Sequence, residues 1–175
     1  IIGFHNDAAG RELRVLQDVY KSESDTNQRN QAIGALMLAY GYNKTTWQQA
    51  LDLYTRQCSI GVNARDLATM AATLAAGGRN PVTGKQVMDA AKVPGVLAVM
   101  ATAGLYDDSG KWLYHTGLPA KSGVGGGIIA VSPGKFGIAV VAPPLDDAGN
   151  SVKAQRAIAA VSNALGGDPY APRTK

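Results

Sequence analysis

Hydrophobic residues in the first two thirds of the chain recur at helical spacing. Ile33, Leu36, Met37 and Tyr40 stand at positions i, i+3, i+4 and i+7, which places them on one side of a helix. Gly41 follows directly, and glycine most easily adopts the positive φ at which many helices end. This pattern predicts an amphipathic helix that stops at Gly41.

Capping residues mark two further helices. Thr46 and Gln49 have capping-box spacing and predict a helix that runs to about Cys58. Asn63 can accept a hydrogen bond from the first turn of a third helix, and Asp66 favours the positive end of its dipole. The residues expected on the buried face of this third helix are Leu67, Met70 and Leu74. The chain then predicts a stop at Gly77-Gly78, a turn at Asn80–Gly84, a helix at Lys85–Lys92 that Pro94 ends or kinks, and a short helix at Val96–Thr102.

After Gly104 the pattern becomes strand-like. Turn residues at Asp107–Gly110 precede a predicted strand at Trp112–Thr116, and Ser132–Lys135 predicts a hairpin turn before a strand at Phe136–Ala142. Three antiparallel strands are the economical interpretation. Helices that cover one side of such a sheet make an α+β fold. The last predicted features are an end to the sheet at Pro143-Pro144, a helix at Ser151–Leu165 and a flexible tail at Gly166–Lys175.

The composition is that of a globular protein, and we expect neither a metal nor a cofactor. The 175 residues are 46% hydrophobic and 17% charged, which suits one domain or part of one. The net charge of +4 comes from scattered Lys and Arg residues, with two Phe for stacking, so we expect no nucleic-acid partner. A single cysteine, Cys58, excludes internal disulfides, and two histidines are too few for a zinc-type cluster. Apolar runs fall well short of the ~20 residues that span a bilayer, and no signal-peptide pattern opens the chain, so we expect a cytoplasmic protein with no membrane partner.

The segment from Leu118 to Gly127 is the most informative about chemistry. Lys121-Ser122-Gly123 on a strand puts a cation and a hydroxyl beside a site, and the following glycines let a ligand approach backbone amides that could act as oxyanion donors. A glycine-rich bulge with a solvated lysine is the alternative. A phosphate loop is disfavoured because Lys121 precedes the glycines and a strand follows them.

Other polar patterns are weaker. Ser132 and Lys135 satisfy Ser-x-x-Lys, but the Pro-Gly between them makes a hairpin turn, so the match is treated as accidental. Glu23 and Asn30 lie two helical turns apart, so both could project from one face and suit an amino-acid substrate. Ordinary surface polarity is the alternative for that pair.

Taken together, these segments resemble the serine-dependent glutaminase family over roughly residues 15 to 165. The motifs that carry the resemblance are Ser22-Glu23, Arg29-Asn30, Ala32-Ile33-Gly34, Tyr54, Gln57-Cys58-Ser59, Leu74-Ala75, Gly77-Gly78, Asn80–Gly84, Gly104–Gly110, Leu118–Gly127, Pro143–Asp146 and Gly149–Val152. The resemblance implies a fold similar to part of the serine β-lactamases and penicillin-binding proteins. It also implies hydrolysis of L-glutamine to L-glutamate and ammonia through an acyl-serine intermediate, in a homo-oligomer that is a dimer or a tetramer.

The same resemblance implies roles for five residues. Glu23 would hold the substrate ammonium, Asn30 would hydrogen-bond the substrate, and Tyr54 would contact its α-carboxylate end. Tyr106 would orient the nucleophile or relay a proton. The Val124 amide would donate to the oxyanion hole, where removal of one donor costs about 2–4 kcal/mol of transition-state stabilisation. All five positions are expected to converge on one pocket shaped for a free amino acid.

One part of the family pattern has no match in this chain. Lys121-Ser122-Gly123 is similar to the Lys-Ser/Thr-Gly strand of the superfamily, but the Ser-x-x-Lys nucleophile and base, with another substrate-binding asparagine, come earlier in the family. We therefore expect residues 1–165 to be the C-terminal portion of a single catalytic domain, inactive without an N-terminal portion. The alternatives are a catalytically silent binding or assembly module, and a β-lactamase-like hydrolase, which the match at Glu23, Asn30 and Tyr106 disfavours.

Overall fold

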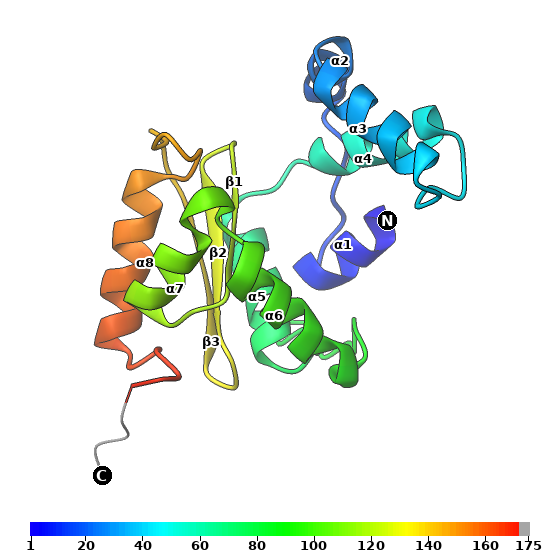
Figure 1. The fold of residues 1–175 in the computed structure, drawn as a ribbon. Coiled ribbons are helices and arrows are strands. Elements are labelled where there is room, and N and C mark those ends of the chain that lie inside the picture. Colours follow the sequence, from blue (N-terminus) through cyan, green and yellow to red (C-terminus); the bar gives the residue numbers. More distant parts are fainter. Residues whose placement is uncertain (172–175) are drawn as a thin grey trace. The chain divides into compact units, whose positions relative to one another are not determined.

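The computed structural model describes residues 1–171 and divides them into two compact units (Figure 1). The first unit comprises residues 1–3 and 12–62, and the second comprises residues 4–11 and the chain from Asn63 onward. The first unit is helical and the second contains the sheet, so the predicted α+β class is confirmed. Among residues 1–171, no helix combines the length and apolarity that crossing a membrane requires.

Three helices form most of the first unit: α2 (Gln17–Asp25), α3 (Gln28–Ala39) and α4 (Trp47–Cys58). Thr46 caps α4 by accepting a hydrogen bond from the Gln49 amide at 3.3 Å, and Gly41 follows α3 with a φ of +75°. Both predicted helix ends are confirmed. An antiparallel bridge between Val15 and Ile60 ties the start of this unit to its end.

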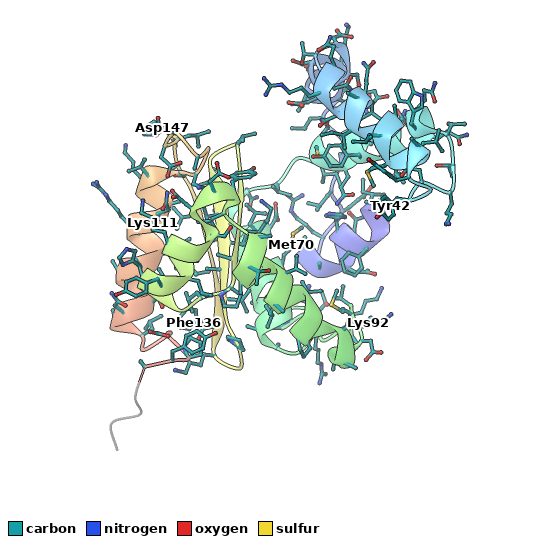
Figure 2. All side chains as sticks on the ribbon, in the orientation of Figure 1. Tyr42, Met70, Lys92, Lys111, Phe136 and Asp147 are labelled. Carbon is teal, nitrogen blue, oxygen red and sulfur yellow. The ribbon has the colours of Figure 1, made fainter. Side chains whose placement is uncertain are left out.

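The apolar side predicted for α3 is exposed within the described residues. Its four members, Ile33, Leu36, Met37 and Tyr40, have exposed fractions between 41% and 70%. Tyr42 (labelled in Figure 2), just beyond α3, is exposed as well. The predicted helix is present, but its apolar side is not buried, and Gly34 makes the close contact with α4, where an added Cβ would lie 3.5 Å from the Trp47 side chain. Ile33 and Met37 instead line an open cavity between the two helices.

An antiparallel sheet lies at the centre of the second unit, with strands β1 (Ala120–Gly123), β2 (Gly127–Ser132) and β3 (Phe136–Val141) in that order. Successive side chains of a strand point to opposite faces. Ile128 and Ala130 of β2 therefore pack toward α8 (Val152–Ala164), whereas Ile129 and Val131 pack toward α5 (Ala64–Ala75). Helices cover both faces of the sheet (Figure 1) and not one face as expected.

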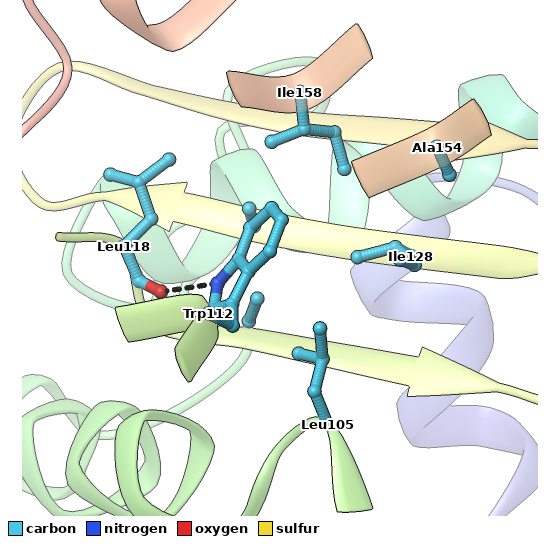
Figure 3. Close-up of a cluster of buried hydrophobic side chains, with 8 residues drawn as sticks. Leu105, Trp112, Leu118, Ile128, Ala154 and Ile158 are labelled. Atoms are coloured by element: carbon cyan, nitrogen blue, oxygen red, sulfur yellow. Dashed lines mark hydrogen bonds between the residues drawn. The ribbon is translucent and has the colours of Figure 1, made fainter. Parts of the chain in front are cut away.

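The larger core cluster is built around Trp112. Its ring is 5% exposed, and its indole N–H donates to the Leu118 carbonyl at 2.8 Å (Figure 3). Leu105, Ile128 and Ile158 surround it and are fully buried. Because the indole has a hydrogen-bond partner, the ring is buried without an unpaired donor.

α5 begins with the predicted capping box. The Asn63 side chain accepts from the Asp66 amide, and the Asp66 carboxylate accepts from the Asn63 amide. The buried face of α5 centres on Ala71 and Ala75, and the residues predicted there, Leu67, Met70 and Leu74, are half-buried. The small residues matter because the backbone of β3 lies close to α5: a Cβ at Gly137 would come within 2.1 Å of the Ala72 nitrogen.

The helix predicted at Lys85–Lys92 was wrong. Amides of Val87 and Met88 donate to the Gly78 carbonyl at 2.9 and 3.2 Å, which holds this segment against the preceding turn. Its helical part is the 3₁₀ turn η1 (Ala90–Lys92). Pro94 lies in the first turn of α6 (Val93–Ala103), where a missing N–H leaves no intrahelical bond unmade, so it does not end a helix.

The strand predicted at Trp112–Thr116 was also wrong. The segment is α7 (Ser109–Thr116), preceded by the 3₁₀ turn η2 (Tyr106–Asp108). In a sequence, a short apolar run does not distinguish a strand from a buried helix. In the structure the segment is helical, and Trp112 and Thr116, four residues apart, are both buried on it. β1 takes the place of that strand in the sheet.

The end of the chain follows the prediction in part. Ser151 caps α8 by accepting from the Ala154 amide at 3.1 Å, and α8 coincides with the helix predicted at Ser151–Leu165. The carbonyls of Gly166 and Gly167 accept hydrogen bonds from Lys135 and Ser132, so the first residues of the predicted tail are tied down. Residues 172–175 of that tail lie outside the described residues.

Candidate active site

The backbone of Tyr106 has an unusual conformation. Its φ is +51°, and it is the one non-glycine residue among residues 1–171 with a positive φ. A residue held there costs on the order of 1–3 kcal/mol and persists where the surroundings enforce it, most often at functional sites. The Ser109 hydroxyl is one such constraint, since it accepts from the Leu105 amide at 2.9 Å and donates to the Tyr106 carbonyl at 2.8 Å.

Lys121 lies against the ring of Tyr106. Its Nζ atom is 4.6 Å from the ring centroid and donates to the Gly104 carbonyl at 3.2 Å and to the Ser122 carbonyl. Burial lowers the pKa of the Lys121 ammonium, because a partly desolvated cation loses hydration. Two backbone carbonyls therefore hold the Lys121 ammonium beside an aromatic ring, where a cation is favourably placed. The residue as a whole is exposed, and the two carbonyl contacts fix its ammonium group in place.

Ser122 lies next to Lys121 and is buried. Its side chain is 4% exposed, and its hydroxyl lies 3.4 Å from the Gly104 carbonyl. Neighbouring residues of a strand face opposite ways, so the same strand that presents Lys121 to Tyr106 turns Ser122 inward. The strand therefore offers a cation at this site and keeps the hydroxyl buried.

Val124 sits in the turn between β1 and β2, close to Tyr106. The turn is closed by a hydrogen bond from the Gly126 amide to the Gly123 carbonyl at 2.9 Å, and Val124 is 69% exposed. A Cβ added at Gly149 would lie 3.6 Å from Val124 Cγ1 and 3.7 Å from Tyr106 Cε2. The second unit thus brings Tyr106 and Val124 together at Gly149, with Lys121 over the Tyr106 ring. An amide, a hydroxyl and a cation are the groups that acyl transfer uses.

In the first unit, Asn30 and Tyr54 line the same cavity. It lies between α3 and α4 and measures about 390 Å³. Its lining residues are Asn30, Ile33, Gly34, Met37, Asn43, Ala50, Leu51 and Tyr54. Polar amides on an otherwise apolar wall fit a small ligand with a polar end. Asn43, which donates to the Gly34 carbonyl at 3.1 Å, was not anticipated, because a lone asparagine in a predicted loop carries no signal.

Glu23 lies on α2 and is exposed, and it is not among the residues that line this cavity. α2 ends at Asp25 and α3 begins at Gln28, so the expectation that Glu23 and Asn30 share one helix face was wrong. Thr26 interrupts the helix, and its hydroxyl donates to the Ser22 carbonyl at 2.9 Å. Side-chain bonds of this kind compete with helix continuation.

The side chains of Ser132 and Lys135 both make hydrogen bonds that stabilise the fold. The Ser132 hydroxyl donates to the Gly167 carbonyl at 2.7 Å, and Lys135 donates to the Gly166 carbonyl. Each side chain ties the β2–β3 turn to the residues after α8. The pair does not form a serine–lysine catalytic motif, as the hairpin turn predicted. No group of three or more His, Cys, Asp or Glu within residues 1–171 is placed to hold a metal ion.

Comparison with known proteins identifies close relatives. A family model described as Glutaminase matches residues 1–170. The glutaminase of Colwellia psychrerythraea strain 34H is 54% identical over 162 residues, which are 93% of this chain and 52% of the relative. A glutaminase of Brucella canis is 53% identical over 167 residues, 95% of this chain and 53% of that protein. The chain therefore spans about half the length of the curated relatives it matches.

Solved structures of glutaminases are also similar to this chain. A structure titled "Probable glutaminase ybaS" superposes with a TM-score of 0.96 at 47% identity, covering 98% of this chain and 55% of that chain. A probable glutaminase from Bacillus subtilis, complexed with 6-diazo-5-oxo-L-norleucine, gives a TM-score of 0.90 at 27% identity, over 97% of this chain and 57% of the other. A structure of Mglu in its glutamate form gives 0.93 at 34% identity, over 99% and 40%.

Proposed function

This chain belongs to the glutaminase family, and from that premise we propose that its residues supply one half of a catalytic domain that hydrolyses L-glutamine to L-glutamate and ammonia. The family match over residues 1–170 is the observation that carries the proposal. The fold, similar to solved glutaminases and so to the serine β-lactamase-like class, supports it. Relatives solved with glutamate and with a diazo-oxo amino acid support a free amino acid as the substrate.

The proposed chemistry is acyl transfer to serine. The serine oxygen adds to the side-chain amide carbon while its proton passes to the base. The tetrahedral oxyanion then collapses, the amide nitrogen takes up that proton, the C–N bond breaks, and ammonia leaves. Water then hydrolyses the acyl ester and releases glutamate. The one Ser-x-x-Lys spacing in residues 1–175, Ser132 and Lys135, lies in a hairpin turn with both side chains bonded to backbone carbonyls. In the proposed scheme the nucleophile and its base therefore come from a segment other than these residues.

Within this scheme, the second unit stabilises the transition state. The Val124 amide donates to the oxyanion, and the Tyr106 hydroxyl relays a proton between the serine and the leaving ammonia. Their shared position around Gly149 supports these roles, as does the enforced positive φ of Tyr106. The adjacent Lys121 ammonium favours negative charge that develops near the Tyr106 hydroxyl.

The first unit recognises the amino-acid end of the substrate. The Glu23 carboxylate pairs with the α-ammonium through a charge-assisted bond, Asn30 hydrogen-bonds the substrate, and Tyr54 contacts the α-carboxylate end. The shared cavity of Asn30 and Tyr54 supports the last two roles. The exposure of Glu23 leaves its carboxylate accessible to a cationic ligand.

Two samples test the function: the 175-residue chain alone, and the protein expressed from the complete reading frame that contains it. Enzyme-coupled detection of glutamate, in parallel with a chromogenic β-lactam, measures the activity of each. We expect glutamate from the reading-frame product, none from the chain alone, and no β-lactam hydrolysis. Glutamate release by the chain alone would show that these residues contain a nucleophile, contrary to the proposal.

The catalytically silent alternative has its own signature. A reading-frame product with an intact mass of about 18 kDa, no partner chain and no glutamine hydrolysis would favour a binding or assembly module. Native mass spectrometry of the same sample reports whether the proposed dimer or tetramer forms. Hydrolysis of the β-lactam without that of glutamine would favour the β-lactamase-like alternative.

A further inference from the structure

A fully buried asparagine is bonded to the peptide group that enters Tyr106. Asn150 is 0% exposed, and its Nδ2 atom donates to the Leu105 carbonyl at 3.2 Å. That carbonyl belongs to the peptide plane from which the φ of Tyr106 is measured. The next peptide plane begins at the Tyr106 carbonyl, which accepts from Ser109 at 2.8 Å. A side chain therefore holds each of the two peptide groups that flank Tyr106.

The loop that carries Asn150 is itself tightly held. The Asp146 amide donates to the Asn150 carbonyl at 2.8 Å, and the Asn150 amide donates to Asp146 Oδ1, also at 2.8 Å. Gln155 on α8 donates to Asp146 Oδ2 at 2.7 Å. The Asn150 amide group is thus presented by a rigid loop, so its bond to Leu105 transmits the position of the loop to the Tyr106 backbone.

The hydrogen bonds of Asn150 are not those of a residue that serves stability alone. No hydrogen-bond partner for its Oδ1 atom lies among residues 1–171. Buried polar atoms are nearly always paired, and an exception calls for a reason. Moreover, the Leu105 carbonyl also accepts from the Asp108 amide at 3.0 Å, so it does not need Asn150 for a partner. The bond from Asn150 therefore adds a second hydrogen bond to the Leu105 carbonyl, from a different part of the chain, and so restricts the orientation of that peptide group further.

Asn80 is a buried asparagine that shows the contrast. It is also 0% exposed, and its Nδ2 donates to the carbonyls of Asp7 and Ala8 at 2.8 and 3.0 Å. Its Oδ1 accepts from the amides of Val82 and Thr83 at 2.8 and 3.2 Å. Both amide atoms are satisfied, as expected of a residue that stabilises a turn.

We infer that Asn150 is a positioning residue for catalysis: it holds the Leu105–Tyr106 peptide so that Tyr106 keeps its left-handed backbone and its side chain keeps one fixed position. The inference rests on the proposed role of Tyr106 in glutamine hydrolysis. Gly149, next to Asn150, faces both residues, since a Cβ added there would lie 3.7 Å from Tyr106 Cε2 and 3.6 Å from Val124 Cγ1, so the same loop borders both side chains.

The test compares four variants of the reading-frame product: Asn150→Ala, Asn80→Ala, Tyr106→Phe, and the double variant Asn150→Ala with Tyr106→Phe. Steady-state kinetics with glutamine are normalised to the folded fraction measured by circular dichroism. We expect Asn150→Ala to lower kcat about 10- to 100-fold, the size of effect that a displacement of about 1 Å produces, with KM changed less than about threefold. Asn80→Ala lowers stability and leaves kcat per folded molecule within about twofold.

The double variant separates positioning from general loosening of the fold. If Asn150 acts through the Tyr106 hydroxyl, Asn150→Ala lowers kcat less than about threefold once that hydroxyl is absent. Effects that multiply, or equal losses in Asn80→Ala and Asn150→Ala, would overturn the inference. Full turnover by Tyr106→Phe would instead refute the proposed role of Tyr106, and the role of Asn150 with it.

A crystal structure of Asn150→Ala gives a readout that does not depend on activity. We expect the φ of Tyr106 to leave the left-handed region, or its ring to move off Lys121. An unchanged Tyr106 in a folded variant would contradict the inference whatever the kinetics of the protein. Impaired Tyr106→Phe together with a fully active Asn150→Ala would leave the proposed function standing and remove the positioning role.

Discussion

Replacing Asp66 by asparagine removes one buried negative charge at the start of α5 and keeps nearly the same volume. Asp66 is 3% exposed. Its oxygens accept from the Nε and Nη2 atoms of Arg11 at 2.7 and 2.6 Å, and Oδ2 also accepts from the Asn63 amide at 2.8 Å. In Asp66→Asn an amide oxygen at the Oδ2 position can still accept from Asn63 and from Arg11 Nη2, but the amide NH₂ at the Oδ1 position faces the Arg11 Nε donor. We expect a clear loss of stability in the second unit.

The magnitude follows from the interactions that are lost. A hydrogen bond to a charged group contributes about 1.5–3 kcal/mol. The Arg11 side chain is 49% exposed, so solvent screens this ion pair, and the lower part of that range applies to the one bond that is lost. Loss of the favourable charge at the helix N-terminus adds about 0.3–1 kcal/mol. Asp66→Asn should therefore lower the free energy of unfolding by about 2–3 kcal/mol.

Urea denaturation followed by tryptophan fluorescence measures this loss. A Trp47→Phe background leaves Trp112, buried in the core of the second unit, as the sole reporter. Asp89→Asn is the matched control in the same unit, because Asp89 is an exposed cap of a short 3₁₀ turn. Its effect should stay within about 0.5 kcal/mol. A double-mutant cycle with Arg11→Ala isolates the coupling between the two side chains.

The pH dependence gives an independent check. The hydrogen bond from Arg11 lowers the pKa of the Asp66 carboxyl below its ordinary value of about 3.9. The carboxylate therefore contributes its full stabilisation above that ordinary value and loses it as the pH falls through the lowered folded-state pKa. The gap between Asp66 and Asp66→Asn should be constant at neutral pH and close below about pH 4. A gap under about 0.5 kcal/mol at pH 7, or one that persists in acid, would refute the reasoning.

Three further outcomes are expected. Gly104→Ala should destabilise the second unit by about 3 kcal/mol or more, since the new Cβ would lie 1.7 Å from the Ala120 carbonyl oxygen. In the control Gly110→Ala the new Cβ meets no atom within 4 Å, so this variant should not be destabilised in this way. Equal urea midpoints for the two variants would contradict the prediction. Tyr106→Phe should lower kcat of the reading-frame product about 100-fold or more if the hydroxyl relays a proton, and near-normal turnover would remove that role. Glu23→Gln should raise KM for glutamine about tenfold as the charge-assisted contact to the ammonium is lost, and an unchanged KM would exclude it.

Local signals were sufficient for several elements. The caps at Thr46 and Asn63, the stop at Gly41 and the turn at Ser132–Lys135 depend on residues within four positions of one another, and each lies where the pattern predicted. The prediction of secondary structure was wrong where hydrogen bonds to residues outside the segment determine its conformation. The Gly78 carbonyl captures amides of the segment predicted to be a helix at Lys85–Lys92.

The amino-acid order alone was enough to place the chain in its family and to mark Tyr106 and Val124 as positions of interest, because the motifs that identify a family are linear. The tertiary structure decided how those positions are held. The positive φ of Tyr106, the ammonium of Lys121 over its ring and the amide of Asn150 against the Leu105 carbonyl join residues from well-separated parts of the chain. Such contacts depend on how β1, the loop after β3 and α8 pack together, and no local pattern encodes that packing.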